Sequence, residues 1–240
     1  MKTVIVTGST GGLGCALTEE LIKNIDNRVI CVYRNEKKFA EVIETLINSE
    51  IPFDRYKTSD ADDYSEMCKM FDNTTDEVIL ILSAFSIVPI KKIGDFEPDE
   101  ISKMVDGNIK SNVMIINSVV SWCKINGKQM RLINIDSGAA DYPLSGWANY
   151  GAGKAYINRF ISVLDLEMPE YKVVSIDPGV LDTDMQARIR ETSAEVFDKV
   201  DTFIGYKNDG TLNRPKDVAA YIIDRYVDNW KTAELREKFR

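Results

Sequence analysis

Residues 3–14 read Thr3-Val-Ile-Val-Thr-Gly-Ser-Thr-Gly-Gly-Leu-Gly14. The first five residues are β-branched, which favours a strand. Gly8 permits a tight turn, Gly12 lets the backbone approach a bound group, and Gly14 lets the following helix pack closely on the sheet. The stretch therefore predicts a strand, a turn and the start of a helix, in that order.

Short β-rich runs alternate with helix-length segments along the whole chain, which is the pattern of a parallel sheet covered on both faces. We expect strands at Thr3–Thr7, Arg28–Tyr33, Phe53–Thr58, Glu77–Leu82, Met130–Ile135 and Lys172–Ile176. We expect helices at Gly12–Asn24, Glu36–Asn48, Tyr64–Asp72, Pro98–Ile125, Asn149–Glu167, Asp184–Lys199 and Pro215–Asp228. The fold class is thus α/β, a doubly wound parallel sheet in three layers with strand order 3-2-1-4-5-6. A seventh strand is left open, because the last segment is short and charged.

The 240 residues contain no repeat and no Gly/Ser linker, which fits one domain over residues 1–240. The segment 184–213 is polar and poorly periodic beyond its first turns. It follows the sixth predicted strand and so lies at the carboxyl edge of the sheet, where ligands bind in such folds. It is either a substrate lid or an ordinary surface excursion.

Composition excludes several classes of function. The net charge of −8 argues against a nucleic-acid or anionic-membrane partner, because either needs a concentrated basic surface. The chain has no histidine, which removes Ser-His-Asp hydrolysis and histidine-based dehydrogenation. The four cysteines lie far apart without a C-x-x-C pair, so no metal site is expected. No apolar run is long enough for a signal peptide or a bilayer span, and we expect a cytoplasmic protein.

The glycine-rich turn predicts a dinucleotide site of the Rossmann type, because the helix N-terminus offers unpaired N–H groups to a pyrophosphate. Its candidate ligands are Gly8, Thr10, Gly11, Gly12, Leu13 and Gly14. Arg34 follows the second predicted strand, where an NAD-selective site usually carries a carboxylate, and its guanidinium suits the 2′-phosphate of NADP. The alternative is a solvent-facing arginine. Asp60 follows the third predicted strand, where it meets the adenine edge or caps the next helix.

Ser137, Tyr150 and Lys154 have the spacing of a hydride-transfer site. Tyr150 and Lys154 are four residues apart and share one face of a helix. A neighbouring ammonium lowers a tyrosine pKa, and a shift of about 2–3 units would bring it close to neutrality. We expect the lysine and a cationic nicotinamide ring to supply that shift together. The spacing alone is weak, because Tyr33 and Lys37 also satisfy it.

The glycine turn with Ser137, Tyr150 and Lys154 resembles the short-chain dehydrogenase/reductase family over nearly the whole chain. The resemblance implies that Asn108 organises a water relay to the lysine. It also implies that the loop starting at Pro178 contacts the nicotinamide through Pro178, Gly179, Val180 and Thr183. Further motifs, Ser137-Gly-Ala-Ala140 and Gly146-Trp147 among them, look most like the sepiapterin reductase and benzil reductase branch.

The main departure from the family pattern follows the fourth predicted strand. Members usually have Asn-Asn-Ala-Gly there, whereas this chain has Leu82-Ser-Ala-Phe85. Ala84 is a candidate cofactor contact, and Phe85 either places a ring beside the cofactor or points away. An apolar wall for the substrate is expected from Phe85, Tyr142, Trp147 and Met185, although tryptophan and methionine are more often core residues.

The resemblance implies an NADPH-dependent carbonyl reductase that converts a ketone or vicinal diketone to a secondary alcohol, with Tyr150 as general acid. NADP is the expected cofactor in preference to NAD. The alternatives are a reductase of 3-oxoacyl or sugar-type ketones and a catalytically silent NADP-binding regulator. The partners expected are a small carbonyl substrate and a second copy of the chain, joined through the helices predicted at Pro98–Ile125 and Asn149–Glu167.

Overall fold

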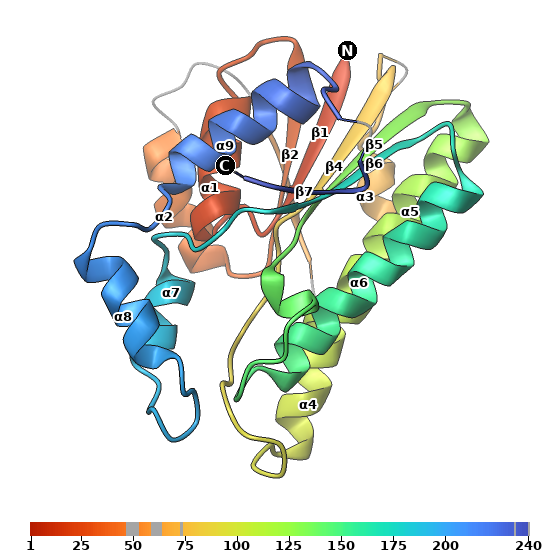
Figure 1. Cartoon of the computed structure of the whole chain (residues 1–240). Coiled ribbons are helices and arrows are strands. Elements are labelled where there is room, and N and C mark those ends of the chain that lie inside the picture. The colour runs from red at the N-terminus through yellow and green to blue at the C-terminus, as the bar shows by residue number, and fades with distance from the viewer. Residues whose placement is uncertain (47–52, 59–63, 73, 233, 240) are drawn as a thin grey trace.

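The structure, a computed structural model, describes residues 1–46, 53–58, 64–72, 74–232 and 234–239. Within these residues seven strands form one parallel sheet in the order β3-β2-β1-β4-β5-β6-β7 (Figure 1). The strands are β1 (Lys2–Thr7), β2 (Asn27–Tyr33), β3 (Asp54–Lys57), β4 (Glu77–Leu82), β5 (Gln129–Ile135), β6 (Lys172–Asp177) and β7 (Arg236–Lys238). This order confirms the doubly wound sheet predicted from the sequence and adds the seventh strand that the sequence left open.

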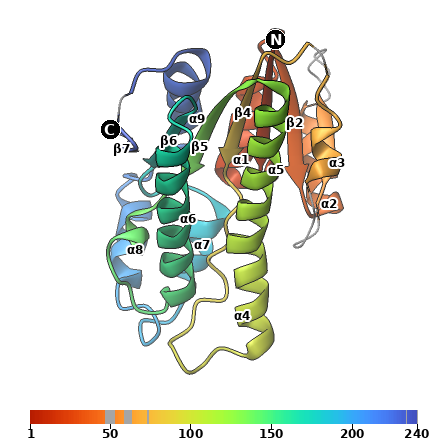
Figure 2. The same cartoon turned by 90° about the vertical axis from the view of Figure 1, so that its right-hand side faces the viewer.

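Helices cover both faces of the sheet (Figures 1 and 2). One face carries α1 (Gly12–Leu21), α2 (Glu36–Leu46) and α9 (Pro215–Ile222), the last of which continues into a π-helical turn, η3 (Ile223–Asp228). The other face carries α3 (Ser65–Cys68), α5 (Ser111–Asn126) and α6 (Ala148–Glu167). A π-helical turn, η1 (Asp106–Lys110), joins α4 (Pro98–Val105) to α5, so the helix expected over Pro98–Ile125 is one continuous rod with a widened turn in it.

The central strands are buried on both faces, which explains their unbroken apolar sequence. In β1, Val4 and Val6 belong to the core beneath α1 and α9, whereas Ile5 belongs to the core beneath α5 and α6. All three side chains are fully buried, and each contributes about 1.5–3 kcal/mol from removal of its apolar surface from water. The alternation fixes the register of the sheet, because a slip by one residue would exchange the two cores.

The helix expected at Asp184–Lys199 is wrong beyond its first two turns. Helix α7 (Asp184–Arg190) ends there, and a separate helix, α8 (Val200–Asn208), lies where none was predicted. Ser193 accepts two backbone hydrogen bonds in the intervening turn, from Val196 and Phe197. Phe197 is completely buried, so burial of this ring redirects the chain and overrides the helical propensity of the segment.

Two other helices are shorter than predicted. Helix α1 ends at Leu21, not Asn24, and α3 spans Ser65–Cys68 in place of the predicted Tyr64–Asp72. The end of the helix predicted at Glu36–Asn48 lies outside the described residues. None of the described helices is both long and apolar enough to cross a membrane.

The carboxyl ends of the parallel strands meet at one edge of the sheet, together with α4, α7 and α8 (Figure 1). The glycine turn after β1 shapes this edge. Gly8 has φ of +65°, and a Cβ there would lie 2.9 Å from the Cα of Ala84. A Cβ on Gly14 would lie 2.2 Å from the carbonyl oxygen of Gly8. The turn thus depends on glycine for the close approach of its own backbone.

We expect Gly14→Ala to lower the free energy of unfolding by about 1–3 kcal/mol, because the added methyl group overlaps the turn backbone. Gly205→Ala is the matched control, since Gly205 lies inside α8 and a Cβ there meets nothing within 4 Å. The control should be neutral or more stable, because alanine favours helix over glycine. Urea unfolding measures both variants, and equal stability of the two would contradict this account of the turn.

Candidate active site

A cavity of about 520 Å³ opens at the carboxyl edge of the sheet. Its walls include Ser137, after β5, and Tyr150 and Lys154, on adjacent turns of α6. The loop after β6 and helix α7 form the opposite wall. The sequence-predicted trio therefore lies together in one hollow, which also reaches the start of α1 at Gly12 and Leu13.

Tyr150 is buried, and the protein groups around it favour the neutral phenol. Burial raises its pKa to about 12, and the nearby carboxylates of Asp136 and Asp177 act in the same direction. A side-chain hydrogen bond with Ser137 works against this shift. The expected lowering of the Tyr150 pKa is therefore not produced by the protein groups on their own, which favour the protonated phenol.

Lys154 is also buried, and desolvation lowers its pKa to about 8, although Asp136 and Asp177 oppose the shift. Its Nζ donates a hydrogen bond of 2.6 Å to the carbonyl oxygen of Ile135. The same Nζ lies 5.9 Å from the centre of the Tyr150 ring. Lys154 is thus held by the end of β5, beside the ring of the tyrosine.

Phe85 points into the site. Its ring centre lies 3.9 Å from Lys154 Nζ and meets the ring of Tyr150 edge-on at 5.5 Å. The ring also fills the space next to Gly153, where a Cβ would lie 3.0 Å from Phe85 Cζ. Of the two orientations that the sequence left open, the ring does not point away but is directed toward Tyr150 and Lys154.

Asn108 lies in the π-helical turn η1 and fixes the loop that carries Phe85. Its side chain accepts a hydrogen bond of 2.8 Å from the backbone N–H of Ser86 and donates one of 2.7 Å to the carbonyl oxygen of Ser86. Its own carbonyl oxygen accepts a hydrogen bond of 2.8 Å from Asn112 Nδ2. The contacts that the structure shows for Asn108 are to this loop and this helix, and its role in a water relay stays a prediction.

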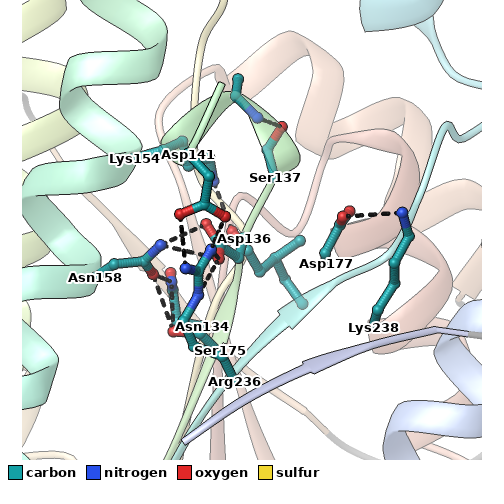
Figure 3. Close-up of polar contacts among 12 residues, drawn as sticks. Asn134, Asp136, Ser137, Asp141, Lys154, Asn158, Ser175, Asp177, Arg236 and Lys238 are labelled. Carbon is teal, nitrogen blue, oxygen red and sulfur yellow. Dashed lines mark hydrogen bonds and ion pairs between the residues drawn. The ribbon is translucent and has the colours of Figure 1, made fainter. Parts of the chain in front are cut away.

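Figure 3 shows a polar network around Asp136, next to Ser137, that was not predicted from the sequence. Arg236 in β7 binds Asp136 at 2.7 Å and forms two hydrogen bonds of 2.8 Å with Asp141. Asn158 of α6 donates to both carboxylate oxygens of Asp136 at 2.9 Å. Arg236 thereby ties together the two ends of the short segment that contains Ser137. It also holds the pKa of Asp141 below its usual range.

All four residues expected to form an apolar wall, Phe85, Tyr142, Trp147 and Met185, line the larger cavity. Trp147 is buried and stacks on Phe197 with ring centres 4.9 Å apart, so it joins the core beneath α8 as well as lining the cavity. Met185 lines the cavity from α7, and Tyr142 lines it with a side chain that is 71% exposed. The segment 184–213 therefore packs on the site through aromatic rings.

A second cavity, of about 370 Å³, lies over the glycine turn and extends to the end of β2. Its walls include Gly8, Thr10, Gly11, Arg34 and Ala84, as expected for a nucleotide cleft. Lys38 of α2, which the sequence analysis missed, lines both cavities and lies 4.0 Å from Asp184 of α7. Lys38 follows Arg34 by four residues and lies in the first turn of α2, and this spacing was the available signal.

Two of the predicted cofactor residues, Gly12 and Thr183, lie against each other. Gly12 faces Thr183, because a Cβ at Gly12 would lie 2.3 Å from Thr183 Cγ2. Glycine is therefore required at position 12 because the start of α1 touches the loop after β6 there, besides any approach to a pyrophosphate. Pro178, Gly179 and Val180 line the larger cavity, and Asp60 lies outside the described residues.

Sequence comparisons agree with this geometry. The family model described as short chain dehydrogenase matches residues 2–194. The benzil reductase ((S)-benzoin forming) of Bacillus cereus is 32% identical over 231 residues, which cover 92% of each chain. The sepiapterin reductase of Bos taurus is 30% identical over 206 residues, which cover 80% of this chain and 77% of that protein.

Among solved structures, the KRED1-Pglu enzyme has a TM-score of 0.83 and 22% identity, with 100% of both chains covered. That likeness supports the fold. The chain belongs to the short-chain dehydrogenase/reductase family of oxidoreductases. Its relatives confirm the resemblance to the benzil reductase and sepiapterin reductase branch.

We expect Arg236→Gln to lower the free energy of unfolding by about 1–2 kcal/mol, because it leaves the buried Asp136 carboxylate without its cation. The cost is below that of a fully buried pair, since the Arg236 side chain is 41% exposed. Lys238→Gln is the control, because Lys238 contacts Asp177 at a longer 3.7 Å and is 68% exposed.

The difference in free energy of unfolding between wild type and Arg236→Gln should depend on pH through Asp141. Its folded-state pKa is lowered, so its pairing with Arg236 stabilises the protein above the ordinary carboxyl pKa. That stabilisation is lost as the pH falls through the lowered pKa. The gap between wild type and Arg236→Gln should narrow in acid, and an equal loss in Lys238→Gln would contradict the role given to Arg236.

Proposed function

We propose that the protein is an NADPH-dependent carbonyl reductase that converts a ketone or vicinal diketone to a secondary alcohol. The observation that carries the proposal is the single cavity that contains Ser137, Tyr150 and Lys154 and adjoins the cleft over the glycine turn. The similarity to two benzil reductases of Bacillus supports a dicarbonyl substrate. The fit of a nicotinamide cofactor is supported by the glycine turn at the start of α1, which brings backbone N–H groups to the cleft.

A bound NADPH would supply the hydride, and the residues of the chain would supply binding and proton transfer. Ser137 and Tyr150 would hold the substrate carbonyl oxygen, and Tyr150 would donate its proton to the alkoxide as general acid. The raised pKa of Tyr150 suits a donor that must stay protonated. Lys154 would bind the nicotinamide ribose and place its charge near the phenol, while Asn108 would support the proton relay.

The cleft would distinguish NADP from NAD through cations at the end of β2. Arg34 and Lys38 both line the smaller cavity, and guanidinium and ammonium groups favour a 2′-phosphate over a ribose hydroxyl. The loop from Pro178 to Thr183 would contact the carboxamide of the nicotinamide. We also propose that the 240 residues act as one domain with segment 184–213 as a substrate lid, since Phe197 of that segment stacks on Trp147.

A homodimer is part of the same proposal. Exposed apolar side chains gather on the long helices, with Ile101 and Val105 on α4 and Tyr156, Val163 and Leu166 on α6. Apolar residues of this size on two neighbouring helices favour a partner that covers them.

Tyr150→Phe should lower the rate of NADPH oxidation with a diketone by about 10²–10⁴-fold, because the general acid is removed. The dissociation constant for NADPH should change little. Tyr221→Phe is the matched control, since Tyr221 lies on α9 and outside both described cavities. Stopped-flow absorbance at the NADPH band measures both variants. Turnover by Tyr150→Phe at the wild-type rate would refute the proposed function.

Arg34→Ala should weaken NADPH binding by about 10–100-fold, because a charge-assisted contact to the 2′-phosphate is worth about 1.5–3 kcal/mol. NADH binding should change by less than a factor of about three on the same reasoning. Arg159→Ala on the exposed side of α6 controls for loss of a positive charge. Fluorescence titration of both cofactors decides the matter, and equal weakening of NADH would remove Arg34 from the 2′-phosphate site.

A further inference from the structure

The ammonium of Lys154 has more hydrogen atoms than nearby acceptors. A lysine ammonium carries three N–H donors. In the part of the chain that the structure describes, its one hydrogen-bond acceptor is the carbonyl oxygen of Ile135 at 2.6 Å. The side chain is buried where it lines the larger cavity, and burial of an ammonium with few partners is costly. A further contact on another face of the charge would reduce that cost.

The ring of Phe85 meets that need. Lys154 Nζ lies 3.9 Å from the ring centre, well inside the distance at which a cation is attracted to an aromatic face. We propose that Phe85 is a positioning residue, whose ring face binds the Lys154 ammonium and holds it beside Tyr150. The proposal rests on the catalytic role given to Lys154 above, and it gives a physical role to the residue that replaces the usual glycine after β4.

The ring of Phe85 packs against Gly153 of α6. A side chain at position 153 would begin 3.0 Å from Phe85 Cζ and 3.4 Å from Phe85 Cε1, so the ring occupies the space that a larger residue would need. Tyr150 contacts the edge of the same ring at 5.5 Å. Phe85 is therefore held between two residues of α6 while its face stays on the third, Lys154.

Charged groups face Lys154 from several elements, and all bear on its titration. Asp136 at the end of β5 and Asp177 at the end of β6 both favour the ammonium. Behind them, Arg236 and Lys238 of β7 pair with these two carboxylates. The phenol of Tyr150 lies on the same helix. Tyr150 also contacts the Phe85 ring, whereas Phe85→Leu removes none of the carboxylates and cations around Lys154.

Phe85→Leu is the direct test, because leucine keeps an apolar side chain and removes the ring face. The titration of Lys154 can be followed by NMR in protein labelled with ¹³C at lysine Cε. The wild-type lysine should titrate near the pKa of about 8 given by its surroundings. In Phe85→Leu we expect that midpoint to fall by about one pH unit, as for loss of a desolvated cation–π contact.

The control for loss of an aromatic ring is Phe71→Leu. Phe71 packs edge-on against Trp122 of α5, with ring centres 4.8 Å apart, and lies away from the described cavities. It should leave the Lys154 titration in place while lowering stability. An unchanged midpoint in Phe85→Leu would overturn the proposal, and so would an equal shift in Phe71→Leu, since the effect would then be a general one.

Gly153→Ala provides a second, independent variant. Its methyl group should displace the ring from Lys154 and shift the Lys154 midpoint in the same direction as Phe85→Leu. In the Phe85→Leu background the same change should add little, because the two residues act through one contact. Additive shifts in the double variant would overturn the proposal even if one of the single variants folds poorly.

Catalysis gives a second readout. At saturating NADPH, the alkaline limb of kcat/KM for carbonyl reduction should move to lower pH in Phe85→Leu, because the ammonium form is lost sooner. At pH 9 the variant should be about tenfold slower than wild type if the midpoint falls by one unit. The NMR titration needs no substrate, so a protein that reduces no carbonyl would refute the proposed function while leaving the Phe85–Lys154 contact testable.

Discussion

A parallel sheet that is buried on both faces offers its polar chemistry at the ends of its strands, because its sides are occupied by apolar packing. The alternation of Val4, Ile5 and Val6 between two cores expresses that constraint here. Ser137, Tyr150 and Lys154 gather at the carboxyl edge for this reason, together with the glycine turn after β1. Because the site lies on this buried core, Tyr150 and Lys154 are both desolvated. Desolvation raises the pKa of Tyr150 and lowers the pKa of Lys154.

Much of this arrangement could be predicted from the sequence. The strands and their order follow from local apolar runs and from the handedness of βαβ connections. The trio at positions 137, 150 and 154 follows from its spacing only in combination with the glycine turn, since Tyr33 and Lys37 have the same spacing. The pattern could not show the break between α7 and α8, because it depends on burial of Phe197 against Trp147. It could not show Arg236 on Asp136 either, since the partners are 100 residues apart. From the sequence we expected Lys154 and a cationic nicotinamide ring to lower the Tyr150 pKa together, whereas among the protein groups desolvation by the surrounding core has the largest effect and raises it.

The loop after β4 illustrates how a departure from a family pattern can be compensated nearby. Asn108 and Asn112 hold the backbone of this loop from the adjacent helix, so Phe85 enters the site from a fixed base. Its ring then takes up the room that Gly153 leaves on α6. The bulky Phe85 and the glycine at position 153 are thus complementary in shape. Each residue explains why the other is tolerated.

The link between Arg236 and the Ser137 segment also has a consequence for biosynthesis. Strand β7 is made after the other six strands, and it is paired along β6 in the finished sheet. Until it leaves the ribosome, Asp136 and Asp141 lack the guanidinium that joins them. The glycine turn after β1 is therefore made early in translation, whereas the segment around Ser137 gains its tie to β7 late. A chain that stopped before residue 236 would have most of its core but would lack the guanidinium that joins Asp136 to Asp141.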